Sequence, residues 1–187
     1  MNYKDYQKSR NAAWELLIDC EIKALPIKIS DICKLIGIPV KFADLQGESD
    51  GYTFIHEGKP IIVINKNCTN NSRLRFTVAH ELGHILLGHV GKYALVNREP
   101  SPNDNPIEQE ANIFASRLLA PACVLWGCEV QSAEDIMKLC DISYQAASFR
   151  MERMKVLYGR NKFLTSPLER IVFDNFRPFI RRYLYGG

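Results

Sequence analysis

Three of the four histidines in this 187-residue chain fall within ten residues, at a spacing that suits a metal ion. His80, Glu81 and His84 form the pattern H-E-x-x-H. On a helix, positions i and i+4 lie on one face, so His80 and His84 can direct imidazole nitrogens at one ion about 2 Å from each. Glu81 is offset by about 100° and is better placed as a base for an adjacent water. The pattern therefore predicts metal-assisted hydrolysis.

A catalytic zinc site needs a third protein ligand and leaves its fourth position open. His89 is the nearest candidate. The extended pattern H-E-x-x-H-x-x-G-x-x-H would need glycine and histidine where this chain has Leu87 and Val90. That pattern is therefore absent, and a glutamate on a later helix is the alternative.

The helix expected over residues 106–119 offers Glu108 and Glu110. They differ by about 200° around the axis, so only one of them can face a metal. Glu110 lies beside the apolar face that includes Ile113 and Phe114, whereas Glu108 suits the favourable negative charge of a helix N-terminus. The residues thus favour Glu110 and leave Glu108 open.

The elements that must position these side chains predict an α+β fold. Strands are expected at 38–42, 52–56 and 61–64, the last two joined by a four-residue loop, in a small, mainly antiparallel sheet. A helix over about 71–87 carries the histidines, and helices follow at about 106–119, 132–139, 143–157 and 167–183. We predict a core over residues 1–128 and a helical segment over 129–187 that packs on it as a single compact unit.

The composition excludes several classes of protein. With 47% hydrophobic and 24% charged residues the chain is not disordered. Its net charge of +3 is below what a dedicated nucleic-acid binder usually carries. No apolar run is long enough to cross a membrane, and no export signal is recognised, so a cytoplasmic protein is expected. The six cysteines contain no C-x-x-C pair and are expected to be reduced thiols.

Two segments resemble the signature of the ImmA/IrrE family of metallopeptidases: residues 73–84 around the H-E-x-x-H pattern and residues 108–121, which read EQEANIFASRLLAP. The resemblance covers roughly residues 10–157. It implies a zincin-like fold with a sheet edge that can bind an extended substrate. It also implies zinc ligands at His80, His84 and Glu110, with Glu81 as general base. Its members are cytoplasmic proteases that inactivate helix-turn-helix repressors of mobile elements or stress regulons, which implies a protein substrate of that kind.

A second feature suggests rival functions. Residues 132–157 resemble a helix-turn-helix whose second helix bears Arg150, Arg153 and Lys155, although nearby acidic residues dilute the charge that phosphate binding needs. A helical pair that shapes the peptidase core is favoured over repressor recognition or DNA binding. The alternatives to a zinc endopeptidase are a DNA-binding or a partner-binding transcriptional regulator that retains the peptidase fold.

Overall fold

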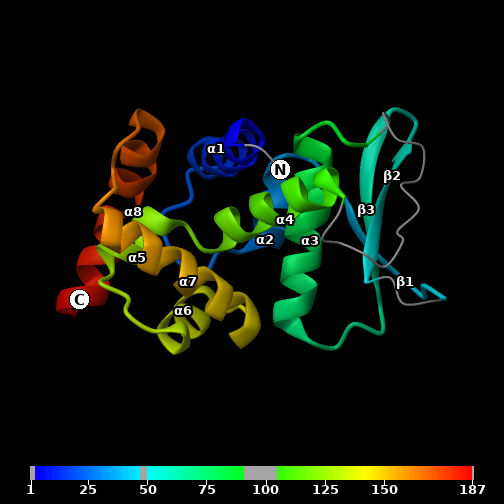
Figure 1. The fold of residues 1–187 in the computed structure, drawn as a ribbon. Helices are drawn as coiled ribbons and strands as arrows, with labels where there is room; N and C mark the ends of the chain where they lie inside the picture. The colour runs from blue at the N-terminus through cyan, green and yellow to red at the C-terminus, as the bar shows by residue number, and fades with distance from the viewer. Residues whose placement is uncertain (1–2, 47–49, 91–104, 187) are drawn as a thin grey trace. The chain divides into compact units, whose positions relative to one another are not determined.

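A computed structural model describes residues 3–46, 50–90 and 105–186 of the chain (Figure 1). The chain forms two compact units: Met1–Ala12 with Ile29–Ala115, and Ala13–Lys28 with Ser116–Gly187. The division into residues 1–128 and 129–187 stays a prediction. Within the described ranges, none of the helices combines the length and the hydropathy needed to span a membrane.

The elements are α1 Tyr3–Asp19, α2 Ile29–Leu35, β1 Val40–Ala43, β2 Gly51–His56, β3 Lys59–Asn65, α3 Asn71–Leu86, α4 Pro106–Leu119, α5 Ala122–Gly127, α6 Ala133–Cys140, α7 Tyr144–Arg160 and α8 Pro167–Tyr185.

The α+β class is confirmed, but the sheet is mixed instead of mainly antiparallel. In the described part of the chain it has the strand order β1-β3-β2, with β1 parallel and β2 antiparallel to β3. The β2–β3 loop has two residues where four were expected, because His56 pairs with Lys59. Glu57 and Gly58 both have positive φ, as a two-residue hairpin turn of this kind requires.

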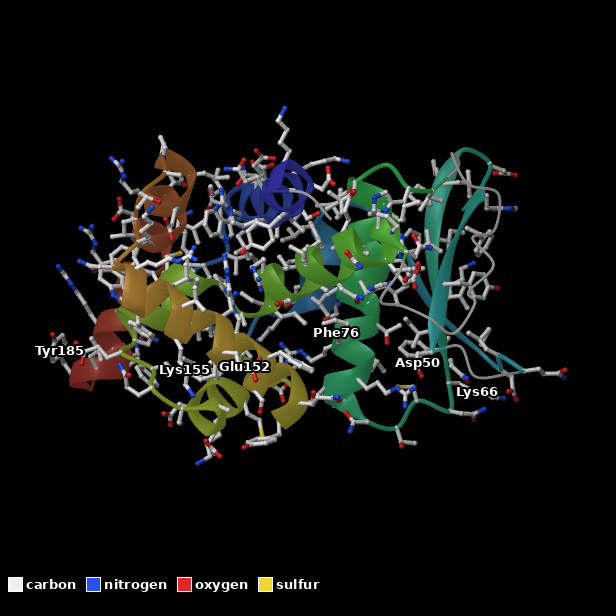
Figure 2. All side chains as sticks on the ribbon, in the orientation of Figure 1. Asp50, Lys66, Phe76, Glu152, Lys155 and Tyr185 are labelled. Carbon is white, nitrogen blue, oxygen red and sulfur yellow. The ribbon has the colours of Figure 1, made fainter. Side chains whose placement is uncertain are left out.

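Helix α3 packs against β2 and β3, as Figure 1 shows in green and cyan. Asn70 begins the helix, because its side chain accepts a hydrogen bond from the Arg73 N–H. The Arg73 side chain also donates to Asp50, labelled in Figure 2, at 2.6 Å. The neighbouring Gly51 must be glycine, because a Cβ there would lie 2.8 Å from the Val63 carbonyl oxygen. The start of β2 is therefore fixed close to α3 and β3.

The first turns of α4 pack tightly on α3. Ala111, Phe114 and Ala115 are fully buried. A Cβ at Gly83 on α3 would lie 3.0 Å from the Phe114 ring and 3.3 Å from the Ala111 Cα. Gly83, which stands between the two histidines of the motif, therefore allows the two helices to approach closely.

The second unit contains a helix pair over the segment that resembles a helix-turn-helix. Ser132 and Ser143 cap α6 and α7 through their side-chain oxygens. The intervening Asp141 ends α6 in the left-handed conformation. Arg150 on α7 is buried and donates from Nε to the Ala120 carbonyl at 2.8 Å. A role of this pair in recognising DNA or a repressor stays a prediction.

Candidate metal centre

Two histidines on α3 and a glutamate on α4 converge in the first unit. His80 and His84 lie one turn apart on α3, and their Nε2 atoms are 3.0 Å from each other. The Glu108 carboxylate lies 3.1 Å from His80 Nε2 through Oε2 and 3.3 Å from His84 Nε2 through Oε1. All three side chains are largely shielded from solvent. This is the one three-residue cluster among the described residues whose ligand atoms could hold a metal ion.

The expectation that Glu110 faces the two histidines is corrected here: Glu108 takes that place. The Glu110 carboxylate instead lies 3.3 Å from His89 Nε2 and 3.6 Å from Lys8 Nζ. Only one of the two glutamates reaches the histidine pair, as their angular separation requires.

The two glutamates lie on opposite sides of the buried face of α4. Assigning Ile113 to the apolar face moved the predicted face toward Glu110, but Ile113 is only half-buried. The fully buried positions include Ala111 and Ala115, three and seven residues after Glu108. At about 100° per residue the two alanines lie within about 60° of Glu108, whereas the fully buried Phe114 lies about 40° from Glu110. Ala111 and Phe114, which both lie against Gly83, mark the face that packs on α3. Glu108 is the glutamate on the histidine side of that face.

The donor atoms are of the types that hold a metal ion and lie close together. His80 Nε2 and His84 Nε2 are 3.0 Å apart, and each contacts a different oxygen of the Glu108 carboxylate, Oε2 at 3.1 Å and Oε1 at 3.3 Å. One ligand atom from each of the three residues therefore lies within reach of a common ion. Two imidazoles and one carboxylate also form a known catalytic zinc ligand set. His80, His84 and Glu108 are therefore the residues that could hold the metal.

The electrostatics of Glu108 favour its ligand form. Hydrogen bonds from His80 and then His84 hold the pKa of the Glu108 carboxyl well below its usual range, although partial burial opposes this. Glu108 is thus ionised at neutral pH, and a carboxylate must be ionised to ligate a metal.

Glu81 follows His80 in α3, and its buried carboxylate accepts a hydrogen bond from a residue of the sheet. It is 2% exposed. The Thr53 hydroxyl on β2 donates to Glu81 Oε2 at 2.9 Å. No local pattern singles out Thr53 beyond its place in an expected strand, because the contact joins residues 28 positions apart. The sheet thus orients the carboxylate that sequence reasoning assigned as general base.

Each of the two histidines has a partner for its second ring nitrogen. His80 Nδ1 lies 2.9 Å from Asn112 Oδ1, and His84 Nδ1 lies 3.1 Å from His89 Nδ1. Burial, and then the neighbouring His84, lower the pKa of His89. Asn112 was not identified from the sequence, although it lies four residues after Glu108 and hence on the same helix face.

Close packing of α4 on α3 should set the position of Glu108 and therefore the affinity of the site for zinc. We expect Gly83→Ala to change the free energy of unfolding by only about 1 kcal/mol, because gained helix propensity offsets the crowding at Phe114. Zinc affinity should fall several-fold, because α4 carries Glu108 and must move away from His80. Thermal unfolding of the metal-free protein and zinc competition against a chromogenic chelator would measure the two effects. Unchanged affinity would contradict the coupling of packing to ligand position.

A zincin also needs a donor to the tetrahedral oxyanion, and the sequence offers several candidates without choosing between them: Tyr52, His56, His89, Tyr93, Arg150 and Tyr158. Tyr93 lies outside the described residues. Tyr158 and Arg150 donate to the backbone carbonyls of Val130 and Ala120. Tyr52 and His56 alternate with Thr53 along β2 and therefore face the opposite side of the sheet from Glu81.

The model of the IrrE N-terminal-like domain, a peptidase family, matches residues 33–152. The match spans well over half of the chain and includes both motif segments around His80 and Glu108. A comparison of the sequence with curated proteins found no match. The extent of the family match establishes membership: the chain belongs to the ImmA/IrrE family of metallopeptidases.

Proposed function

We propose that this chain is a zinc-dependent endopeptidase with a zincin-like core, which hydrolyses a peptide bond in a regulatory protein. The observation that carries the proposal is the convergence of His80, His84 and the Glu108 carboxylate within reach of one ion, beside the buried Glu81. We further propose that the substrate is a helix-turn-helix repressor of a mobile element or stress regulon. The activity would then belong in the cytoplasm, where such repressors act.

In this mechanism Glu81 is the proton carrier. A bound zinc ion supplies Lewis acidity, which polarises the scissile carbonyl and makes water a better nucleophile. Glu81 takes one proton from the attacking water while the water oxygen bonds to the carbonyl carbon. It then passes that proton to the amide nitrogen as the C–N bond breaks, so that an acid and an amine leave. Thr53 keeps the carboxylate pointed at the reacting water through its bond to Oε2.

An extended substrate would bind along β2. In the described part of the sheet, β2 is an edge strand, and Thr53 on it contacts Glu81. A peptide that adds to this edge by backbone hydrogen bonds would pass close to the general base. Substrate recognition would then depend on strand pairing, with side-chain pockets providing selectivity.

Removing the hydroxyl that holds Glu81 should slow catalysis without removing metal. Thr53→Val preserves the shape of the side chain but loses the donor to Glu81. We expect kcat/KM to fall by about 10–100-fold, since one hydrogen bond to a charged group contributes about 1.5–3 kcal/mol. Zinc content should stay unchanged. Thr53→Ser, which keeps a hydroxyl, should retain most of the activity. Equal loss in the two variants would contradict the orienting role.

DNA binding by residues 132–157 receives less support. Arg150, one of its three named basic residues, is buried against a backbone carbonyl and cannot reach phosphate. Glu152 and Lys155, labelled in Figure 2, are both exposed on α7, so this surface has mixed charge. Mixed charge weakens the electrostatic attraction that dominates binding to DNA.

The proposal is tested by incubating the zinc-loaded chain with helix-turn-helix repressors encoded in the same genome. Intact masses of the products should reveal one or a few discrete cuts, which a chelator abolishes and added zinc restores. Repressors left intact by a fully zinc-loaded chain would contradict the proposed substrate class.

A further inference from the structure

Behind the histidine pair, an unbroken line of polar contacts runs from α3 to α1. His84 Nδ1 lies 3.1 Å from His89 Nδ1, His89 Nε2 lies 3.3 Å from Glu110 Oε2, and Glu110 Oε2 lies 3.6 Å from Lys8 Nζ. The side chains of His84, His89 and Glu110 are mostly shielded, with exposures of 10%, 8% and 14%. Lys8, at 57% exposure, is the solvent end of the line.

Once His84 binds a metal through Nε2, only one assignment of protons to the two imidazole rings satisfies these contacts. Nε2 of His84 faces His80 and Glu108, so its lone pair belongs to the metal and its proton must lie on Nδ1. That N–H then donates to His89 Nδ1, which must be unprotonated to accept it. The proton of a neutral His89 is therefore on Nε2, where it donates to the Glu110 carboxylate. Every contact is satisfied by this assignment.

We propose that His89 and Glu110 are positioning residues, which hold His84 in the tautomer and ring orientation that metal binding requires. This inference rests on the proposed function, because it takes His84 as a ligand through Nε2. It gives Glu110 a role that differs from direct ligation. A carboxylate that accepts from an outer histidine increases the basicity of the inner one, much as carboxylate–histidine pairs do at zinc sites, but here through two imidazoles in series.

The geometry also explains why His89 does not complete the site itself. Both of its ring nitrogens are engaged, Nδ1 by His84 and Nε2 by Glu110. The Gly88 that precedes it has a φ of 74°, and the His89 N–H bonds back to the His84 carbonyl at 2.9 Å. This turn places the His89 ring beside the Nδ1 edge of His84, on the side away from Glu108.

The test combines zinc affinity with the tautomer of each ring. Zinc affinity, measured by competition with a chromogenic chelator, should fall by about 10–100-fold in His89→Phe, which keeps a flat ring but loses both nitrogens. His89→Asn places an oxygen near the position of Nδ1 and should recover much of the loss. Glu110→Gln should weaken binding by a smaller factor in the same range, because a neutral amide still accepts the bond.

Nitrogen NMR of the zinc-loaded wild type reports which nitrogen of each histidine ring is protonated. A merely structural role of His89 would not determine this property. His84 should be protonated at Nδ1 and His89 at Nε2 only. Lys8→Met, at the exposed end, and His56→Phe, on β2, are matched controls that should keep affinity within about threefold, as expected for exposed charges and remote sites. Unfolding temperatures of the metal-free variants would identify any that misfold.

The outcomes separate the two claims. Wild-type affinity in both His89→Phe and Glu110→Gln, or a His89 ring protonated at Nδ1, would overturn the positioning role while the peptidase proposal stands. A wild-type chain that takes up no zinc would overturn the proposed function, and the positioning role with it.

Discussion

Replacing Glu81 by glutamine is expected to reduce peptide-bond hydrolysis by about 10²–10⁴-fold, the usual contribution of a general base. Glutamine has nearly the same shape, so the buried site beside Thr53 should be preserved. Its amide cannot take a proton from water or deliver one to the leaving nitrogen. The rate of substrate cleavage by zinc-loaded wild type and variant, at equal metal content, measures this directly.

The control for this prediction is metal content. Glu81 is not among the three converging side chains, so Glu81→Gln should still bind about one zinc per chain. Cleavage at the wild-type rate by a zinc-loaded Glu81→Gln protein would contradict the mechanism. Loss of zinc from that variant would instead contradict the division of roles between Glu81 and Glu108.

The second large effect is expected at Glu108. Glu108→Gln replaces the only carboxylate in the cluster by a neutral amide, so that two histidines remain to hold the ion. We expect zinc content to fall from about one per chain to near zero, together with all activity. The loss should exceed the 10–100-fold drop expected when a residue outside the ligand set is changed. Elemental analysis after gel filtration would measure it.

Glu110→Gln is the matched variant, two residues away on the same helix. It should retain about one zinc per chain when zinc is supplied in excess, although with weaker affinity. His80→Ala and His84→Ala should behave like Glu108→Gln. Loss of zinc from Glu110→Gln with full retention in Glu108→Gln would show that the ligand set includes Glu110 and would contradict the site described here.

Local chemistry was the most predictable part of the molecule. The i, i+4 spacing of His80 and His84 holds for any helix, so two side chains of the site follow from the sequence. Caps such as Ser143 were also recognisable, because a short polar side chain before an apolar run has few other uses.

The third side chain of the site was harder to choose because it depends on how α4 rotates about its own axis. That rotation is fixed by Ala111 and Phe114 packing against Gly83, which is a contact between helices and not a property of either helix alone. Alanines are weak markers of a buried face in a sequence. Phe114, which lies about 40° from Glu110, and the half-buried Ile113 therefore favoured Glu110 in the prediction.

Strand direction and long-range polar contacts could likewise not be predicted from local sequence patterns. The four residues of β1 show no alternation of burial, and nothing in so short a run indicates that the strand pairs in parallel with β3. The bond between Thr53 and Glu81, and the line through His89 and Glu110, join elements that meet only in the folded unit. These contacts orient the proposed base, Glu81, and one of the proposed ligands, His84. The proposed function therefore depends on contacts that local sequence patterns do not predict.

The central claim is that one zinc ion is held by His80, His84 and Glu108. Anomalous diffraction from a zinc-loaded crystal, measured on both sides of the zinc absorption edge, tests it most directly. The account predicts one strong anomalous peak about 2 Å from His80 Nε2, His84 Nε2 and a Glu108 carboxylate oxygen. A peak bounded instead by His89 and Glu110, or no peak near α3 in a crystal grown with excess zinc, would contradict it.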